Sequence, residues 1–251
     1  MVIEAAEVSL LGNRHENQDR VRAVRADLAT LLIAVDGMGG HANGARAAEL
    51  TVEVIEKIFL AQQHPVFDPQ GFLHLAIGRA HAAVVGLGAE MPVETRPRAT
   101  CALCLVQDDS AYWAHIGDSR IYQLRDGEVV DQSRDHSHIE VLLYDGAITR
   151  EQLASHPMRN YVECCLGGDA ELPKMTVSRR KSLRQGDVLL VCTDGFWSPL
   201  AKEHLVGLGS TDGSIDKNLR ALGSIATQTA APHSDNTSAA ALRFGSSRPR
   251  S

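Results

Sequence analysis

A run of apolar residues that ends in an acid constrains this chain more than any other feature. Leu31 to Val35 is the run, and Asp36 follows it, ahead of a glycine-rich segment from Gly37 to His41. Such a run predicts a buried strand, and burying a carboxylate at its end is costly unless a cation or donors compensate the charge. The glycines allow a tight turn that exposes a carbonyl beside the acid. These oxygens predict a site for Mg²⁺ or Mn²⁺, and an ordinary turn with a solvated aspartate is the alternative.

The same pattern recurs later in the sequence. The apolar segment 188–193 ends in Asp194, the segment 112–116 is followed by Gly117 and Asp118, and Asp235 opens the last apolar segment. Acids at strand ends throughout a chain can converge only through the fold, so we interpret them as parts of one site. For Asp118 alone the alternative is a turn residue in a hairpin, because aspartate favours turns.

Together with the polar segment 14–19, these blocks resemble the type 2C metal-dependent serine/threonine protein phosphatases, in the form found in bacteria. The resemblance runs from about Glu7 to Phe244, and its five motifs stand in the family's order. They are Arg14 with Asn17-Gln18-Asp19, Asp36-Gly37-Met38-Gly39-Gly40-His41, Gly117-Asp118-Ser119-Arg120, Thr193-Asp194-Gly195 and Asp235-Asn236. One such block is weak evidence, whereas five in order are specific.

The resemblance implies an α+β fold, a four-layer α-β-β-α sandwich in which two antiparallel sheets are flanked by helices. The residues agree, because two consecutive predicted helices between strand-rich halves favour a layered α+β domain over alternating βαβ units. We expect residues 1–245 to form a single phosphatase domain. Residues 246–251 are rich in Ser, Arg and Pro with nothing to bury, and are expected to be a flexible C-terminal tail.

Hydrophobic periodicity predicts the secondary structure. Strands are expected at 2–10, 21–24, 29–35, 99–106, 111–116, 119–124, 173–177, 187–192 and 236–244, and helices at 45–60, 198–205, 215–229 and after Asp68-Pro69. The three strands between 99 and 124 are expected to form one meander. Asn43 or Gly44 could cap the first helix, and Asp126-Gly127 is typical of a type I′ hairpin turn. Segment 131–157 is expected to be helical in pieces, and in the resembled family this region is a flap over the substrate side.

The resemblance also implies roles for the acids, position by position. Asp36 would bridge two central metal ions, Gly37 would give its carbonyl to one of them, and Asp194 and Asp235 would complete the other. Asp118 resembles the ligand of a third, more weakly held ion. The ions would be Mn²⁺ or Mg²⁺, and they would generate a metal-bridging hydroxide for in-line attack on phosphorus.

Arg14 would clamp the substrate phosphate with its planar guanidinium, while an ordinary surface arginine is the alternative. Asp19, and with it Gln18, would reach metal-bound waters. Two positions depart from the family's commonest pattern. Gln18 replaces a glutamate, and Met38 stands where many eukaryotic members have a histidine proposed as the general acid. A thioether cannot donate a proton, and His41 is more typical of a structural donor than of a replacement acid.

Composition limits the remaining possibilities. The formal net charge is -6 and the one basic run is Arg179-Arg180-Lys181, which disfavours nucleic-acid binding. Five cysteines, an odd number in mostly apolar contexts, favour reduced thiols. Cys101 and Cys104 form a C-x-x-C, but on a strand they would face opposite ways. The N-terminal segment lacks a signal-peptide pattern and no apolar run is long enough to span a membrane, so a monomeric cytoplasmic protein is expected.

The function implied is metal-dependent hydrolysis of phosphoserine and phosphothreonine in proteins, opposing a Ser/Thr kinase, so phosphorylated proteins and a cognate kinase are the expected partners. A pseudophosphatase that only binds phosphoproteins is the alternative. A degenerate scaffold usually loses an acid, whereas Asp36, Asp118, Asp194 and Asp235 are all present. A two-metal nuclease is disfavoured because the chain has no basic groove pattern.

Overall fold

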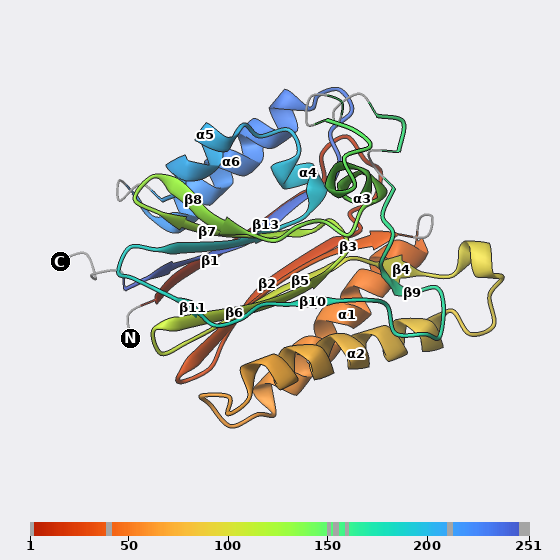
Figure 1. Cartoon of the computed structure of the whole chain (residues 1–251), viewed down its shortest axis with the longest axis horizontal. Coiled ribbons are helices and arrows are strands. Elements are labelled where there is room, and N and C mark those ends of the chain that lie inside the picture. Colours follow the sequence, from red (N-terminus) through yellow and green to blue (C-terminus); the bar gives the residue numbers. More distant parts are fainter. Residues whose placement is uncertain are drawn as a thin grey trace.

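The computed structural model describes residues 3–38, 42–149, 152, 156–158, 161–209 and 213–245. Two antiparallel sheets lie face to face, and helices cover the outer face of each (Figure 1). This arrangement confirms the α+β, four-layer sandwich expected from the sequence. The segment Gly39-Gly40-His41 and the predicted tail at 246–251 lie outside the described residues.

The first sheet has five strands in the order β1-β13-β12-β7-β8. Their bounds are Ile3–Leu10, Thr237–Phe244, Val188–Cys192, Arg120–Arg125 and Glu128–Gln132, in that order. On its outer side lie α4 (Asp194–Trp197), α5 (Lys202–Gly207) and α6 (Ile215–Thr229) (Figure 1). Apolar side chains of α6, among them Leu219 and Ala226, pack with the outward side chains of β1, β12 and β13.

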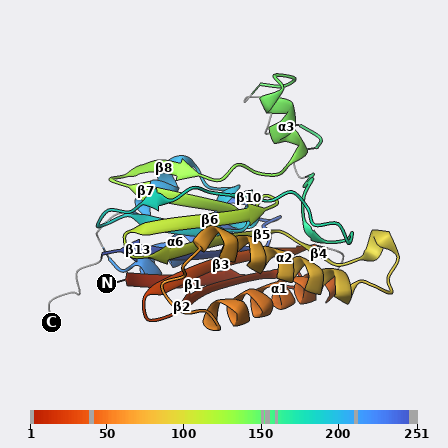
Figure 2. The ribbon, with the colours of Figure 1, turned by 60° about the horizontal axis from the view of Figure 1, so that its bottom comes forward.

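The second sheet is built around β3 (Ala29–Met38), which pairs with β2 (Asp19–Arg25), β5 (Cys101–Gln107) and the short β4 (Arg98–Ala99). The remaining strands are β6 (Ser110–Ile116), β9 (Leu166–Gly167), β10 (Thr176–Val177) and β11 (Lys181–Ser182). Helices α1 (Ala42–Leu60) and α2 (Pro69–Leu87) cover its outer face. A 3-10 turn at Val93–Thr95 precedes β4, and α3 (His138–Tyr144) stands away from both sheets (Figure 2).

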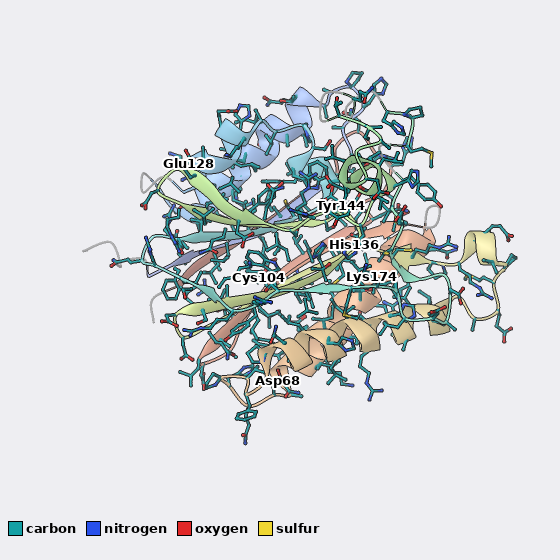
Figure 3. The ribbon with its side chains drawn as sticks, in the orientation of Figure 1. Asp68, Cys104, Glu128, His136, Tyr144 and Lys174 are labelled. Carbon is teal, nitrogen blue, oxygen red and sulfur yellow. The ribbon has the colours of Figure 1, made fainter. Side chains whose placement is uncertain are left out.

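Alternation along β3 and β5 divides the core between two layers. Leu31 and Ile33 pack against α1 and α2, whereas Leu32 and Ala34 fill the space between the sheets. The C-x-x-C follows the same rule, because Cys101 belongs to the helix-side core and Cys104 lies between the sheets (Figure 3). The prediction that the two thiols face opposite ways is confirmed, and all five cysteines are free.

Several local predictions are confirmed. Helix α6 has the predicted bounds, and α2 begins at Pro69 after Asp68, whose side chain accepts a hydrogen bond from the Gly71 amide. Asp126 and Gly127 both have positive φ, 50° and 77°, as a type I′ turn requires. No helix in the described part of the chain is long and apolar enough to cross a membrane.

Other predictions are wrong, and two of the differences affect the residues of the candidate site. The strand at 119–124 does not continue the meander, because β7 lies in the other sheet, next to β12. Gly117, with φ of 93°, makes the connection that crosses from one sheet to the other. The predicted helix at 198–205 is split, because α4 already begins at Asp194, α5 begins at Lys202, and a proline lies between them.

The predicted turn at Gly37 and the caps of α1 are also wrong. Strand β3 continues to Met38 because β4 pairs with its last two residues, and Asn43 and Gly44 lie within α1. Gly37 and Gly44 allow this close approach of helix and strand. A Cβ on Gly37 would lie 2.0 Å from the Gly44 carbonyl oxygen. The predicted strand at 173–177 is reduced to Thr176 and Val177.

Candidate metal centre and substrate pocket

Two carboxylates face each other across neighbouring strands at one edge of the sandwich. Asp19 opens β2 and is directly opposite Asp36 in the β2–β3 register. Like charges in that position destabilise a sheet unless a cation or donors compensate them. Asp19 is buried and accepts a hydrogen bond from the Thr193 hydroxyl (2.8 Å), a residue 174 positions away. The Thr193 bond ties β2 of one sheet to the end of β12 in the other.

Two more acids come from the connections that cross this edge. Asp118 follows the Gly117 crossing, and its backbone oxygen accepts a hydrogen bond from the Trp197 indole (3.0 Å). Asp194 begins α4, in which Trp197 is the last residue, so a single short helix holds both acids in place. Asp118 and Asp194 are both partly exposed and line the same pocket.

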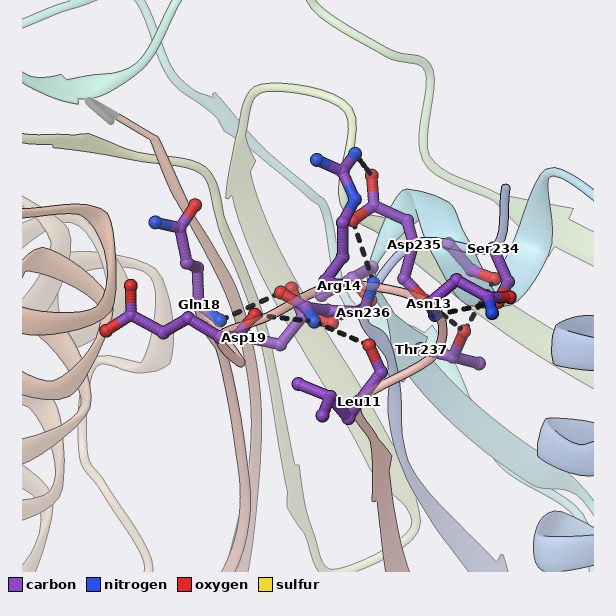
Figure 4. A network of polar contacts seen from close by, with 12 residues as sticks. Leu11, Asn13, Arg14, Gln18, Asp19, Ser234, Asp235, Asn236 and Thr237 are labelled. Atoms are coloured by element: carbon purple, nitrogen blue, oxygen red, sulfur yellow. Dashed lines mark hydrogen bonds and ion pairs between the residues drawn. The ribbon is translucent and has the colours of Figure 1, made fainter. Parts of the chain in front are cut away.

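The fifth acid, Asp235, lies in the turn before β13 and faces Arg14 (Figure 4). The Arg14 guanidinium donates to the Asp235 carboxylate at 2.6 Å. Asn236 holds the Arg14 loop in place, since its side chain donates to the Leu11 and Glu16 carbonyls and accepts from the Gln18 amide. The structure therefore brings the N-terminal loop against the turn before the last strand, across 218 to 225 positions of sequence.

The electrostatics of the cluster show that it has more negative charge than the protein compensates. Burial raises the pKa of Asp19 to about 7. Repulsion from Asp194 and Asp235 also raises it, whereas the hydrogen bond from Thr193 lowers it. Burial, with repulsion from neighbouring acids, raises the pKa of Asp118 to about 8 and that of Asp194 to about 6. Asp36 has its pKa raised by burial and then by the charges of Asp19, Asp194, Asp118 and Asp235. Five acids that affect one another in this way form a site that favours a cation.

The remaining predicted site residues are placed as follows. Gly37 is buried, its amide donates to the Gln18 backbone oxygen at 3.1 Å, and its own carbonyl lies against Gly44. Gln18 therefore contacts the site through its backbone. The side chain of Met38 is partly exposed at the end of β3, and His41 lies outside the described residues.

The donor set fits a hard divalent cation. Asp36, Asp118, Asp194 and Asp235 supply carboxylate oxygens with no cysteine or histidine among them, the chemistry preferred by Mg²⁺ and Mn²⁺. Within the described ranges, no three acidic, histidine or cysteine side chains are already grouped closely enough to hold one ion. Asp235 instead bonds to Arg14, so ion binding would require its carboxylate to turn.

Sequence reasoning missed a cluster behind Asp118. Arg120 makes two hydrogen bonds with Asp135, each 2.8 Å, and its guanidinium lies 3.2 Å from the centre of the Trp197 ring. Arg120 was visible as the last residue of a motif, but its partners are 15 and 77 positions away and carry no local signal. A pocket of about 550 Å³ opens beside this cluster, between α3, α4 and the turn before β13.

The family model for protein phosphatase 2C matches residues 9–230. The chain belongs to the protein phosphatase 2C family. Most of the site described above lies within that match, whereas Asp235 and Asn236 lie beyond its C-terminal end.

Individual relatives agree. The chain is 32% identical to the serine/threonine protein phosphatase PstP of Mycobacterium tuberculosis over 193 residues, 77% of this chain and 36% of that protein. The chain thus spans about a third of that relative's length. It is 30% identical to the protein phosphatase PhpP of Streptococcus pneumoniae over 215 residues, 82% of this chain and 85% of that protein.

A solved structure of the PstP catalytic domain in complex with two manganese ions is also similar. It superimposes with a TM-score of 0.81 at 27% identity, covering 96% of this chain and 98% of that one.

Proposed function

We propose that this protein is a metal-dependent phosphatase that hydrolyses phosphoserine and phosphothreonine in proteins. The observation that carries the proposal is the group of five mutually repelling aspartates, four of them partly exposed, at one edge of a protein phosphatase 2C fold. The named relatives are serine/threonine phosphatases, and none of these names favours the pseudophosphatase alternative.

Four residues would hold the cations through carboxylates. Asp36 would contact two central ions, Asp194 and Asp235 would complete one of them, and Asp118 would hold a third. The Gly37 carbonyl remains a proposed ligand of one central ion. Bound Mn²⁺ or Mg²⁺ would supply Lewis-acid chemistry, which activates water and neutralises phosphate charge. The structure of PstP with two manganese ions favours manganese as the first ion to test.

The remaining polar residues would position the substrate and the ligands. The Arg14 side chain is 57% exposed and bonds to Asp235, so its guanidinium can exchange the Asp235 carboxylate for a substrate phosphate. Asp19, held by Thr193 behind Asp36, would accept hydrogen bonds from water in the site, and Gln18 would place the loop. Met38 cannot protonate the leaving group, so that proton would come from water or from another group.

The setting of the enzyme is part of the proposal. Residues 1–245 would form one phosphatase domain, monomeric and cytoplasmic, that opposes a Ser/Thr kinase in phosphoprotein signalling.

Hydrolysis of para-nitrophenyl phosphate and of a phosphothreonine peptide tests this function. We expect turnover with Mn²⁺ and none in excess chelator, since the ligands are all oxygen atoms. Thiol alkylation should leave most turnover intact, because burial raises the pKa of Cys192 and the other buried thiols and keeps them inert. Full activity in chelator would overturn the proposal, and manganese binding without turnover would favour the pseudophosphatase.

A further inference from the structure

The pocket beside the acid cluster has walls that the hydrolytic reaction does not use. Asp118, Asp194 and Asp235 form one end of it. The other end is made by residues of α3, α4, the segments next to them and the turn before β13. These are Ser137, Ile139, Glu140, Trp197, Pro199 and His233.

The far walls of this pocket suit a long side chain. Ile139, Trp197 and Pro199 provide apolar surface from two separate elements. The Ser137 hydroxyl is buried and has no hydrogen-bond partner, although Ser137 lines the pocket. A buried hydroxyl without a partner costs free energy, and a donor from a bound ligand would recover it. The pocket therefore has both an apolar wall and an unused hydrogen-bonding group.

The charge balance of the far end is negative. Asp135 is matched by the two hydrogen bonds from Arg120, so neither contributes a free charge. Glu140 is partly exposed, lines the pocket, and pairs with no cation in the described part of the chain. His233, exposed at the rim, is the other titratable group there. A ligand group at this end would thus meet one unmatched carboxylate and one unmatched hydroxyl.

We infer that this pocket is a subsite for the substrate residue next to the phosphorylated one, and that it prefers arginine or lysine. The aliphatic stem of such a residue would pack on Trp197 and Ile139, while its cationic head reaches Glu140 and Ser137. The pocket adjoins the acid cluster, so a residue adjacent to the phosphoresidue can reach it. This inference rests on the proposed phosphatase function. The preferred substrates would be protein segments with arginine or lysine next to the phosphoresidue.

The test uses phosphothreonine peptides with arginine, alanine or glutamate on either side of the phosphoresidue. For the unaltered enzyme with Mn²⁺, kcat/KM should be about three- to tenfold higher for arginine than for glutamate at one of these positions. Glu140→Gln should reduce that ratio toward one, and Glu140→Arg should invert it. The ratio should also fall as salt is added, because the Glu140 carboxylate is partly exposed.

Asp145→Asn is the matched control. It removes the same charge from the same helix region, since Asp145 follows α3, but Asp145 is exposed and does not line the pocket. The ratio should be unchanged in this variant. Turnover of every peptide at one rate, or an equal change in Glu140→Gln and Asp145→Asn, would overturn the subsite and leave the phosphatase function intact. Absence of turnover on all peptides and on para-nitrophenyl phosphate would instead overturn the function itself.

Discussion

The carboxylates at the two ends of β12 have pKa values shifted in opposite directions. Asp187, just before the strand, has a fully buried side chain that receives two hydrogen bonds from Arg125, at 2.7 and 2.6 Å. Gln123 and the Arg184 amide donate to it as well. Burial tends to raise the pKa of Asp187, but these donors outweigh it and the pKa is lowered. Asp194, just after the strand, has its pKa raised to about 6 by burial and by Asp235.

The difference in pKa shift reflects whether the protein compensates the charge of each carboxylate. At Asp187 the protein supplies every donor, so the charge is compensated inside the fold and the acid has a structural role. At Asp194, burial and the charge of Asp235 raise the pKa by more than the Gly195 backbone hydrogen bond and the Arg14 charge lower it. A carboxylate left in that state costs stability until a cation arrives. In the proposed function, the acid cluster binds cations, and its uncompensated charge lowers the stability of the metal-free fold.

Asp36→Asn should have the largest effect. Asp36 receives repulsion from Asp19, Asp194, Asp118 and Asp235, so it lies at the centre of the cluster. We expect the two central ions to be lost and kcat/KM to fall by about a thousandfold or more, on the order of 4 kcal/mol. Calorimetry with Mn²⁺ and peptide kinetics measure both effects.

Asp118→Asn is the matched comparison for Asp36→Asn. It should retain the two central ions and turn over slowly, since in the proposed ligand set only the third ion depends on Asp118. Equal loss of manganese in both variants would show that the ligands are assigned wrongly.

The metal-free protein should lose stability as the pH rises from 6 to 8. Folded Asp19 and Asp118, with pKa values of about 7 and 8, hold protons that the unfolded chain has already released. Their contribution is fully present below the unfolded pKa and is lost as pH rises through the folded values. The loss should be on the order of 3 kcal/mol, a fall in Tm of about 5–10 °C by scanning calorimetry in chelator. A flat profile would contradict the raised values.

Asp187→Asn should lower the stability of the fold and leave the acid cluster unaffected. An asparagine cannot match the Arg125 guanidinium, so unfolding free energy should fall by about 2–3 kcal/mol. Manganese affinity and kcat per folded molecule should be unchanged, because Asp187 lies at the other end of β12 from the cluster. Urea unfolding and peptide kinetics would check this pair of results. Loss of manganese binding would mean that the two ends are not independent.

Arg14→Ala should lower activity by less than Asp36→Asn does. A charge-assisted hydrogen bond contributes about 1.5–3 kcal/mol, so kcat/KM on a phosphothreonine peptide should fall about ten- to a hundredfold. Arg14→Lys should recover part of it, because a point charge cannot make the bidentate contact. Wild-type KM and kcat/KM in the alanine variant would show that Arg14 does not hold the phosphate.

The sequence predicted those features that are local in origin. Helix α6, the Asp68 cap and the Asp126-Gly127 turn were predictable because periodicity and turn chemistry act over a few residues. The fold and the family followed from five short motifs in order. The C-x-x-C faces were predictable from the two-residue period of a strand.

Features that depend on distant contacts were not predictable. A glycine-aspartate pair is typical of a hairpin, yet Gly117-Asp118 crosses between sheets because β7 pairs with β12, a strand far along the chain. The contacts of Asp19 with Thr193, and of Arg120 with Asp135 and Trp197, likewise carry no local signal. The contact between Arg14 and Asp235 was not predictable either, because the two residues are far apart in the sequence.

Proton release on manganese binding tests the central claim most directly. If the acids of the cluster are partly protonated in the metal-free protein, Mn²⁺ must displace those protons when it binds. Calorimetry at pH 6.5 in two buffers of different ionisation enthalpy gives their number. We predict a release of about one proton or more per protein, and a smaller release at pH 8.5, where Asp19 and Asp118 are more fully ionised. Binding with no proton release at pH 6.5 would contradict the account.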